Sequence, residues 1–269
     1  MADQIKEAFN RKWLNRETHQ YATGSQTANL LPLALQIVSQ DQRAGVLENI
    51  VKSIATEYDG HLHTGNTGTT CMIDTLAAEG HGNLMYRVAT AKTYPGWGYM
   101  VDQGATTIWE TWAGRLMSHG YPGAESMVMW ATIDEFLYND LAGIRGPEYY
   151  GPGQMAPGFR QIEIRPHVVG DLTHAQASVR TVQGVIASAW KKDGHSVTLD
   201  VTIPAGASAN VSVPTMGLKS VAVAEGGKTV WKDGAYVTGV VGISGASQSA
   251  DYVAFDVGSG AYSFRLAGE

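Results

Sequence analysis

Apolar residues recur at helical spacing in the first part of the chain, up to about residue 145. In the segment RAGVLENIVKSIATEY they fall three or four positions apart, which places them on one face of a helix. Ser25 opens SQTANLLPLALQIVS as a predicted N-cap, and Pro32 predicts a kink or a late start of that helix. Two further segments, TTCMIDTLAAEG and AESMVMWATIDEFLYNDLAG, end on a glycine that favours helix termination. The second of them is the longest predicted helix.

From about residue 159 the period of the pattern changes to two. The segments FRQIEIRP, VTLDVTIP and ANVSVP alternate apolar and polar residues, as half-buried strands do. The pairs Asp193-Gly194 and Asp233-Gly234 predict hairpin turns. We therefore expect an antiparallel β-sandwich or a partly closed barrel over residues 159–269. A segment rich in proline and glycine, residues 146–158, is the expected linker from a helical part over residues 1–145.

The composition restricts the classes of function. With 44 % hydrophobic and 16 % charged residues the chain can bury a core, so it is not a disordered segment. A net charge of −6 without a Lys/Arg cluster argues against a nucleic acid partner. No apolar run is long enough to span a membrane or to act as a signal peptide. From this sequence we expect a cytoplasmic protein. If the chain is a piece of a longer protein, the missing N-terminal part could have carried an export signal.

Cofactor and metal signatures are absent from the sequence. A P-loop, a dinucleotide glycine fingerprint and a GxSxG elbow are all lacking, and the single Cys71 excludes an internal disulfide framework and a Cys-rich zinc site. His61 and His63 could face one side as metal ligands, but no third ligand is close in sequence. We expect ordinary hydrogen-bonding histidines here, either of which could bind a sugar hydroxyl if its loop lines a pocket. We expect no cofactor and no metal.

One carboxylate stands out in the segment GATTIWETWAG, where Glu110 lies among tryptophans. Glycosidases need carboxyl groups at the scissile bond, and aromatic rings stack on the C–H groups of a sugar. The aromatic candidates are Trp97, Trp109 and Trp112. The alternative is that these tryptophans are core residues and that Glu110 is a hydrogen-bonded loop acid. The local pattern leaves both interpretations open.

Other polar groupings are weaker candidates. Asp134 and Glu135 are adjacent on a predicted helix, so they diverge and favour a solvated face. His167, Asp171 and His174 lie in RPHVVGDLTH, which we interpret as a turn network. Neither grouping predicts a catalytic pair.

An ordered series of motifs resembles the C-terminal portion of bacterial α-L-rhamnosidases, glycoside hydrolase family 78. The series comprises YATGSQTANLLPLAL, GHLHTGNTGT, YPGWGYMVDQGATTIWETW, IDEFLYNDLAGI, PGFRQIEIRP and GDLTHAQASV. The resemblance runs from about residue 3 to about residue 215. It implies an (α/α)6 barrel of paired helices followed by a β-sandwich, so the fold class is a two-part α+β chain.

The resemblance also implies an activity. The family hydrolyses terminal α-L-rhamnosyl groups with inversion, and its general base falls on Glu110. Trp97, Trp109, Trp112, His61 and Tyr94 are then expected to line the pocket for a rhamnose-containing glycoside. Two departures are visible, because nothing matches the family's general-acid motif and because Ser126 and Met127 occupy the positions of an Asn-His pair. His119 in the preceding loop could fill the space of that histidine.

A count of helices bears on the partners. A closed (α/α)6 barrel needs twelve helices, and 145 residues supply roughly six, so we expect half of a barrel. Its inner face should be exposed, covered in a homodimer, or covered by a missing N-terminal half. The rival functions are a non-catalytic carbohydrate-binding protein, a split-enzyme subunit that completes its barrel with another chain, and a six-hairpin glycosidase with a different sugar preference.

Overall fold

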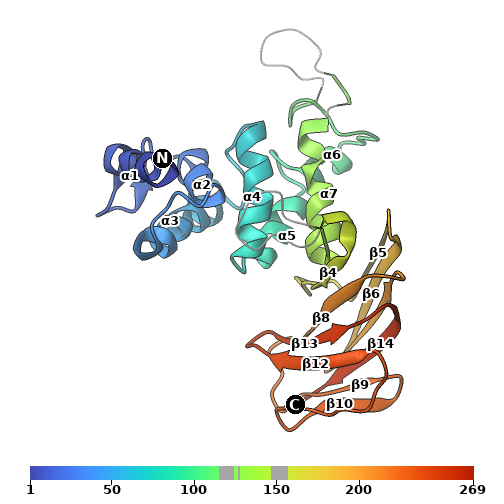
Figure 1. The fold of residues 1–269 in the computed structure, drawn as a ribbon. Coiled ribbons are helices and arrows are strands. Elements are labelled where there is room, and N and C mark those ends of the chain that lie inside the picture. Colours follow the sequence, from blue (N-terminus) through green and yellow to red (C-terminus); the bar gives the residue numbers. More distant parts are fainter. Residues whose placement is uncertain (115–123, 127, 147–156) are drawn as a thin grey trace. The chain divides into compact units, whose positions relative to one another are not determined.

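The structure is a computed structural model that describes residues 1–114, 124–126, 128–146 and 157–269 (Figure 1). The chain divides into two compact units, Met1–Phe136 and Leu137–Glu269. The first unit is helical and the second is built from strands. Among the described residues, no helix combines the length and the apolarity needed to cross a membrane.

The helical unit contains a series of short helices. Their bounds are α1 Ala2–Trp13, α2 Gln26–Ala34, α3 Gln40–Lys52, η1 Ser53–Glu57, α4 Asn66–Ala78, α5 Gly82–Thr90, α6 Trp97–Asp102, η2 Val128–Thr132 and α7 Ile133–Glu135. A two-stranded ribbon of β1 Leu14–Asn15 and β2 Gln20–Tyr21 follows α1. α2 packs against both α3 and α4, and α4 also packs against α5 and η2. Their apolar faces meet in a core that includes Leu30, Leu33, Ile50, Ile54, Met72, Ile73 and Leu76.

Local signals in the sequence account for several helix ends. Ser25 is the N-cap of α2, and its hydroxyl accepts a hydrogen bond from the amide of Ala28 at 3.2 Å. Pro32 lies inside α2, which starts at Gln26, so the alternative of a late start is wrong. At the end of α4 the amide of Gly80 donates to Ala77 at 3.2 Å and the amide of His81 donates to Leu76 at 2.7 Å. This pair of bonds is a Schellman motif, which satisfies the last carbonyl groups of the helix.

The longest predicted helix, residues 124–143, is not one regular α-helix. Its described part consists of the 3₁₀ turn η2, the short α7 and the π-helical η3 Phe136–Leu141. The indole of Trp97 donates to the Trp130 carbonyl at 2.8 Å, and the indole of Trp130 donates to the Glu110 carbonyl at 2.7 Å. One backbone acceptor of η2, the Trp130 carbonyl, is therefore engaged in a tertiary hydrogen bond.

The second unit contains two sheets (Figure 1). The seven-stranded sheet has the order β11-β10-β9-β14-β7-β6-β5, and the five-stranded sheet has the order β12-β13-β8-β4-β3. The strands are β3 Ile144–Arg145, β4 Gln161–Ile164, β5 His174–Thr181, β6 Gly184–Asp193, β7 Ser196–Ile203, β8 Ser208–Pro214, β9 Ala222–Glu225, β10 Lys228–Lys232, β11 Ala235–Tyr236, β12 Ile243–Gln248, β13 Tyr252–Val257 and β14 Gly260–Ala267; the short 3₁₀ turn η4 Pro157–Phe159 precedes β4. Neighbouring strands are antiparallel except for β4 and β8, which pair in parallel.

Alternation along the strands supplies the core between the sheets. On β7 the residues Val197, Leu199, Val201 and Ile203 are buried, and on β14 they are Tyr262, Phe264 and Leu266. These side chains form one hydrophobic cluster with others such as Trp190, Val211 and Phe255. The period of two therefore predicts correctly which strand residues are buried.

Hairpin turns follow the glycine pairs of the sequence. Lys232 pairs with Ala235, and Asp233 and Gly234 both have positive φ, as a two-residue type I′ turn requires. In the other predicted hairpin Asp193 pairs with Ser196, so the loop is Gly194-His195, one residue later than expected. The register of the flanking strands sets that position.

Within the second unit, the end of η3 and the residue after it are bound to β6. The indole of Trp190 on β6 donates to the Leu141 carbonyl at 2.7 Å, and the hydroxyl of Ser188 donates to the Ala142 carbonyl at 2.6 Å. Ile144 and Arg145, which we expected at the end of the helical part, form β3 and pair with β4. These bonds fix the end of η3 against β6.

Candidate functional site

Glu110 is held by its main chain while its side chain is exposed. Its amide donates to the Ala124 carbonyl at 2.8 Å, and its Oε2 accepts a hydrogen bond from the Ala124 amide at 2.8 Å. Its carbonyl accepts from the Trp130 indole at 2.7 Å. The carboxylate therefore combines solvent exposure with a fixed position, although it lies outside any helix or strand.

Three tryptophans pack beside this segment. The rings of Trp97 and Trp112 meet edge to face with centroids 5.0 Å apart, and those of Trp112 and Trp130 are tilted with centroids 4.2 Å apart. Trp97 starts α6 and is only 6 % exposed, whereas Trp112 is half-buried. The interpretation as a core residue therefore fits Trp97. Trp112 is partly packed against the other two tryptophans and partly exposed.

An open pocket of about 630 Å³ has Trp112 in its lining. The loop 58–65 and residues 93–95 form the rest of its lining. This pocket brings together three of the predicted substrate-binding residues, His61, Tyr94 and Trp112. It adds others that the sequence did not single out, namely Tyr58, Thr64 and Thr93.

The two histidines of the loop differ in their surroundings. His61 is 8 % exposed; its Nδ1 lies 3.1 Å from the Tyr58 carbonyl and its Nε2 lies 2.8 Å from the Thr93 hydroxyl. With the proton on Nδ1, that nitrogen donates to the carbonyl and Nε2 accepts from the hydroxyl. The ring of His63 is exposed and stacks on Tyr58 with centroids 4.3 Å apart. His61 therefore braces the loop, and His63 offers its ring to the pocket.

Trp109 lies at a different pocket. This second pocket has a volume of about 440 Å³, and its lining includes Tyr99, Thr106, Trp109 and Glu125. Gly114 has a φ of +62°, and a Cβ built on it would lie 2.7 Å from the Trp109 ring. A glycine is thus required where the chain turns back over this tryptophan. Glu110 is a lining residue of neither pocket.

Several other residues considered in the sequence analysis are exposed or lie outside the described residues. Met127 and His119 lie outside the described residues. Ser126 is exposed, as are Asp134 and Glu135 on α7. Among the residues that the structure describes, no group of three His, Cys, Asp or Glu side chains could hold a metal ion.

Sequence reasoning missed Trp130 and Ala124, which hold Glu110. Trp130 stands in a segment that reads as a plain amphipathic helix, so its indole donor has no visible partner in the sequence. The available signal is general: a buried indole N–H needs an acceptor, and Trp130 is 5 % exposed. Only the fold shows that the acceptor is the Glu110 carbonyl.

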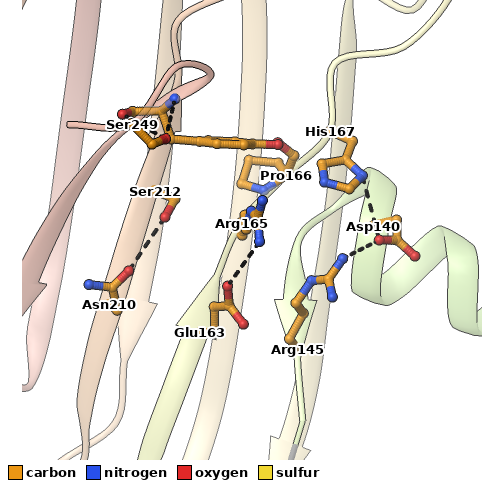
Figure 2. Close-up of polar contacts among 10 residues, drawn as sticks. Asp140, Arg145, Glu163, Arg165, Pro166, His167, Asn210, Ser212 and Ser249 are labelled. Carbon is orange, nitrogen blue, oxygen red and sulfur yellow. Dashed lines mark hydrogen bonds and ion pairs between the residues drawn. The ribbon is translucent and has the colours of Figure 1, made fainter. Parts of the chain in front are cut away.

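A buried ionic cluster lies in the second unit (Figure 2). The carboxylate of Asp140 accepts a hydrogen bond from Arg145 and lies 3.5 Å from Nδ1 of His167. Burial lowers the pKa of His167 to about 4, with further lowering by the charges of Arg145 and Arg165. His167 thus contacts Asp140, which lies on η3. The Nδ1 of His174 instead lies 3.2 Å from the Thr173 hydroxyl. The cluster joins η3 to the start of the sandwich.

Arg165 makes the neighbouring contacts of this cluster. Its guanidinium lies over the ring of Tyr252, 4.9 Å from the centroid. It also lies 3.9 Å from the carboxylate of Glu163 (Figure 2). The hydroxyl of Tyr252 donates to the Pro166 carbonyl at 3.4 Å. These contacts pack the turn after β4 against β13 and have the character of structural interactions.

Comparison with known proteins decides the family. Residues 1–141 match the model of the bacterial alpha-L-rhamnosidase 6 hairpin glycosidase domain, and residues 151–228 match that of the bacterial alpha-L-rhamnosidase C-terminal domain. The chain belongs to the bacterial α-L-rhamnosidase family. This result confirms the resemblance and the two-part fold class, a partial six-hairpin region followed by a β-sandwich.

Curated relatives are much longer than this chain. An alpha-L-rhamnosidase of Formosa agariphila is 29 % identical over 223 residues, which cover 81 % of this chain and 23 % of the relative. An alpha-L-rhamnosidase of Streptomyces avermitilis is 30 % identical over 194 residues, which cover 71 % of this chain and 18 % of the relative. The chain therefore spans about a fifth of the length of these relatives.

Solved structures show the same arrangement of elements. The alpha-L-rhamnosidase from Dictyoglumus thermophilum superposes with a TM-score of 0.86 at 31 % identity, over 99 % of this chain and 28 % of that one. The Streptomyces avermitilis alpha-L-rhamnosidase, complexed with L-rhamnose, gives a TM-score of 0.79 at 26 % identity, over 98 % and 23 % respectively. The rhamnosidase from Aspergillus terreus shares the fold with a TM-score of 0.75 at 23 % identity, over 98 % and 26 %.

Proposed function

We propose that this chain takes part in the hydrolysis of terminal α-L-rhamnosyl groups and that Glu110 is the general base. The observation that carries the proposal is the way Glu110 is held. Its exposed carboxylate and its amide both form hydrogen bonds with Ala124, beside a cluster of tryptophans. Membership of the α-L-rhamnosidase family and the resemblance of the segment GATTIWETWAG to the family's catalytic segment support it.

The proposed chemistry inverts the anomeric carbon. The carboxylate of Glu110 accepts a proton from a water molecule, whose oxygen attacks the sugar while the bond to the leaving oxygen breaks on the opposite face. The leaving oxygen takes a proton from a second carboxyl group, the general acid. No segment of this sequence matches the family's acid motif, so we propose that the acid comes from another helical segment. Loss of general-acid help typically slows hydrolysis about a hundredfold to ten-thousandfold.

The test uses an activated aryl α-L-rhamnoside, whose leaving group needs little protonation. We expect the chain to hydrolyse this substrate slowly. NMR should show that the sugar is first released with the inverted anomeric configuration. Glu110→Gln should lower kcat at least about a hundredfold. Asp134→Asn is the matched control, because Asp134 is an exposed acid on α7 away from both pockets. Wild-type turnover by Glu110→Gln would rule out the base assignment.

A second candidate function is sugar binding without turnover. The 630 Å³ pocket carries aromatic rings, hydroxyl groups and the His63 ring, which suit a sugar, but Glu110 is not part of its lining. Calorimetry with L-rhamnose measures this function directly. Tyr94→Ala should weaken binding, and because Tyr94 is 57 % exposed its replacement should leave the fold intact. Binding by a chain that shows no turnover would favour this candidate.

We also propose that a second helical segment covers the exposed apolar side of the helical unit. α1 contains no buried residue, and Ile5, Trp13 and Leu35 are exposed by 62 %, 43 % and 63 %. The segment would belong either to a second copy or to a separate N-terminal half. Sedimentation at several concentrations separates them: a dimer indicates a second copy, and a monomer that binds a hydrophobic dye indicates the missing half. A monomer that binds no dye would contradict the proposal.

A further inference from the structure

A series of indole-to-carbonyl hydrogen bonds leads from the core of the helical unit to Glu110. Trp97 is buried at the start of α6, and its Nε1 donates to the main-chain carbonyl of Trp130 at 2.8 Å. Trp130 is also buried, and its Nε1 donates to the main-chain carbonyl of Glu110 at 2.7 Å. Both distances lie at the short end of the normal range for N–H···O bonds.

The ring of Trp112 fills the space beside both indoles. It meets Trp97 edge to face at 5.0 Å and Trp130 at 4.2 Å between ring centroids. Such packing restricts the rotation of each ring. An indole has one donor and no acceptor, so a ring held in this way directs its N–H at one point.

We propose that Trp130 is a positioning residue for Glu110, an inference that rests on the proposed role of Glu110 as base. The Ala124 bonds fix the amide and the carboxylate of Glu110, and the Trp130 bond fixes its carbonyl. Together they hold the two peptide groups on either side of the Glu110 Cα, from which the side chain projects. Trp130 touches no substrate in this proposal and acts only through Glu110.

Small errors in the position of a catalytic group have large effects on rate. A displacement of about 1 Å can cost a hundredfold, and a lost hydrogen bond to a main-chain carbonyl allows part of that displacement. We therefore expect loss of the Trp130 donor to lower kcat about tenfold and to leave KM within about twofold. The remaining bonds to Ala124 limit the loss.

The test removes the donor and keeps the aromatic ring. Trp130→Phe is one variant, and 3-benzothienylalanine incorporated at position 130 is the sharper one, because sulfur replaces the N–H in a ring of similar shape. Trp190→Phe is the matched control. It removes the same kind of bond, an indole donor to the Leu141 carbonyl at 2.7 Å, in the other compact unit.

Two measurements decide the outcome. Hydrogen–deuterium exchange of peptides covering residues 104–114 should accelerate in both Trp130 variants and stay at the wild-type rate in Trp190→Phe. On the aryl α-L-rhamnoside, the Trp130 variants should lose kcat at nearly constant KM. Trp130→Phe should have no further effect when Glu110 is already Gln, because the indole acts through that residue.

The inference and the proposed function fail in different ways. Wild-type exchange at residues 104–114 in the isosteric variant overturns the inference, and so does an equal loss of kcat in the presence and the absence of Glu110→Gln. Full turnover by Glu110→Gln overturns the proposed function, and the exchange result then still shows whether Trp130 holds this segment.

Discussion

Glu110 and Ala124 are bound to each other twice, once from main chain to main chain and once from the Ala124 amide to the Glu110 carboxylate, both at 2.8 Å. The two bonds join residues that are fourteen positions apart in the sequence. The second bond is made by Oε2, at the end of the glutamate side chain. The position of the carboxylate therefore depends on side-chain length as well as on charge.

The first prediction follows from this length. Glu110→Asp retracts the carboxylate by one methylene, about 1.5 Å, and removes it from reach of the Ala124 amide. We expect kcat on an aryl α-L-rhamnoside to fall about a hundredfold with little change in KM. Asp134→Glu, the reverse change at an exposed acid, should have no effect. Equal rates for Glu110→Asp and the wild type would show that the position of the carboxylate does not matter.

The second prediction concerns the cap of α2. Ser25→Ala removes the acceptor for the Ala28 amide, and we expect the free energy of unfolding to fall by about 1 kcal/mol. Ser39 occupies the same position at α3, but its side chain caps no amide, so Ser39→Ala should cost less. Urea unfolding followed by circular dichroism measures both. Equal losses in the two variants would contradict the assignment of the cap.

The third prediction concerns the buried ion pair of Asp140 and Arg145. Both side chains are largely buried, so Asp140→Asn leaves the guanidinium without its carboxylate and should cost about 3–5 kcal/mol. The exposed pair of Arg16 and Asp41 is the control, and Asp41→Asn should cost less than about 1 kcal/mol. Denaturant unfolding compares the two. A loss below about 1 kcal/mol for Asp140→Asn would show that the buried pair is dispensable.

The fourth prediction concerns pH. Because burial and the two arginines lower the pKa of His167 to about 4, the folded protein binds this proton less readily than the unfolded chain, whose pKa is about 6.5. The contribution to stability is present above about pH 6.5 and is lost as the pH falls toward 4. We expect a loss of about 1–2 kcal/mol between pH 7 and pH 5, since the Asp140 carboxylate at 3.5 Å partly favours the imidazolium.

The matched variant isolates this histidine. His167→Gln removes the titrating group, so its stability relative to the wild type should rise by the same amount between pH 7 and pH 5. Urea unfolding at closely spaced pH values gives both curves. Parallel curves for the two proteins would show that the pKa of His167 is the same in the folded and the unfolded states.

Local chemistry made some features predictable from the sequence. Ser25 caps α2 and Gly80 ends α4 because these residues satisfy backbone groups a few positions away. Alternation along VTLDVTIP predicted the half-buried strand β7, because side chains on a strand point alternately to its two faces. The loop Gly194-His195 differs by one residue because cross-strand register, which is not local, sets the turn.

The candidate site was predicted in part. His61, Tyr94 and Trp112 line one pocket. Trp109 lines a different pocket, and Trp97 is buried. The sequence names aromatic residues near one another along the chain, and it does not show which face of each ring is covered. That depends on how α6 and η2 pack.

The sequence by itself determined the family, the order of the helical and β-sandwich parts and the identity of the candidate base. These features depend on motifs and on periodicity, both of which involve residues close together along the chain. The tertiary structure decided how Glu110 is held, because Ala124 and Trp130 are fourteen and twenty positions away along the chain. It also decided that residues 128–141 form short 3₁₀, α and π turns. The Trp130 carbonyl accepts there from the distant Trp97 indole, and this contact has no signature in the local sequence.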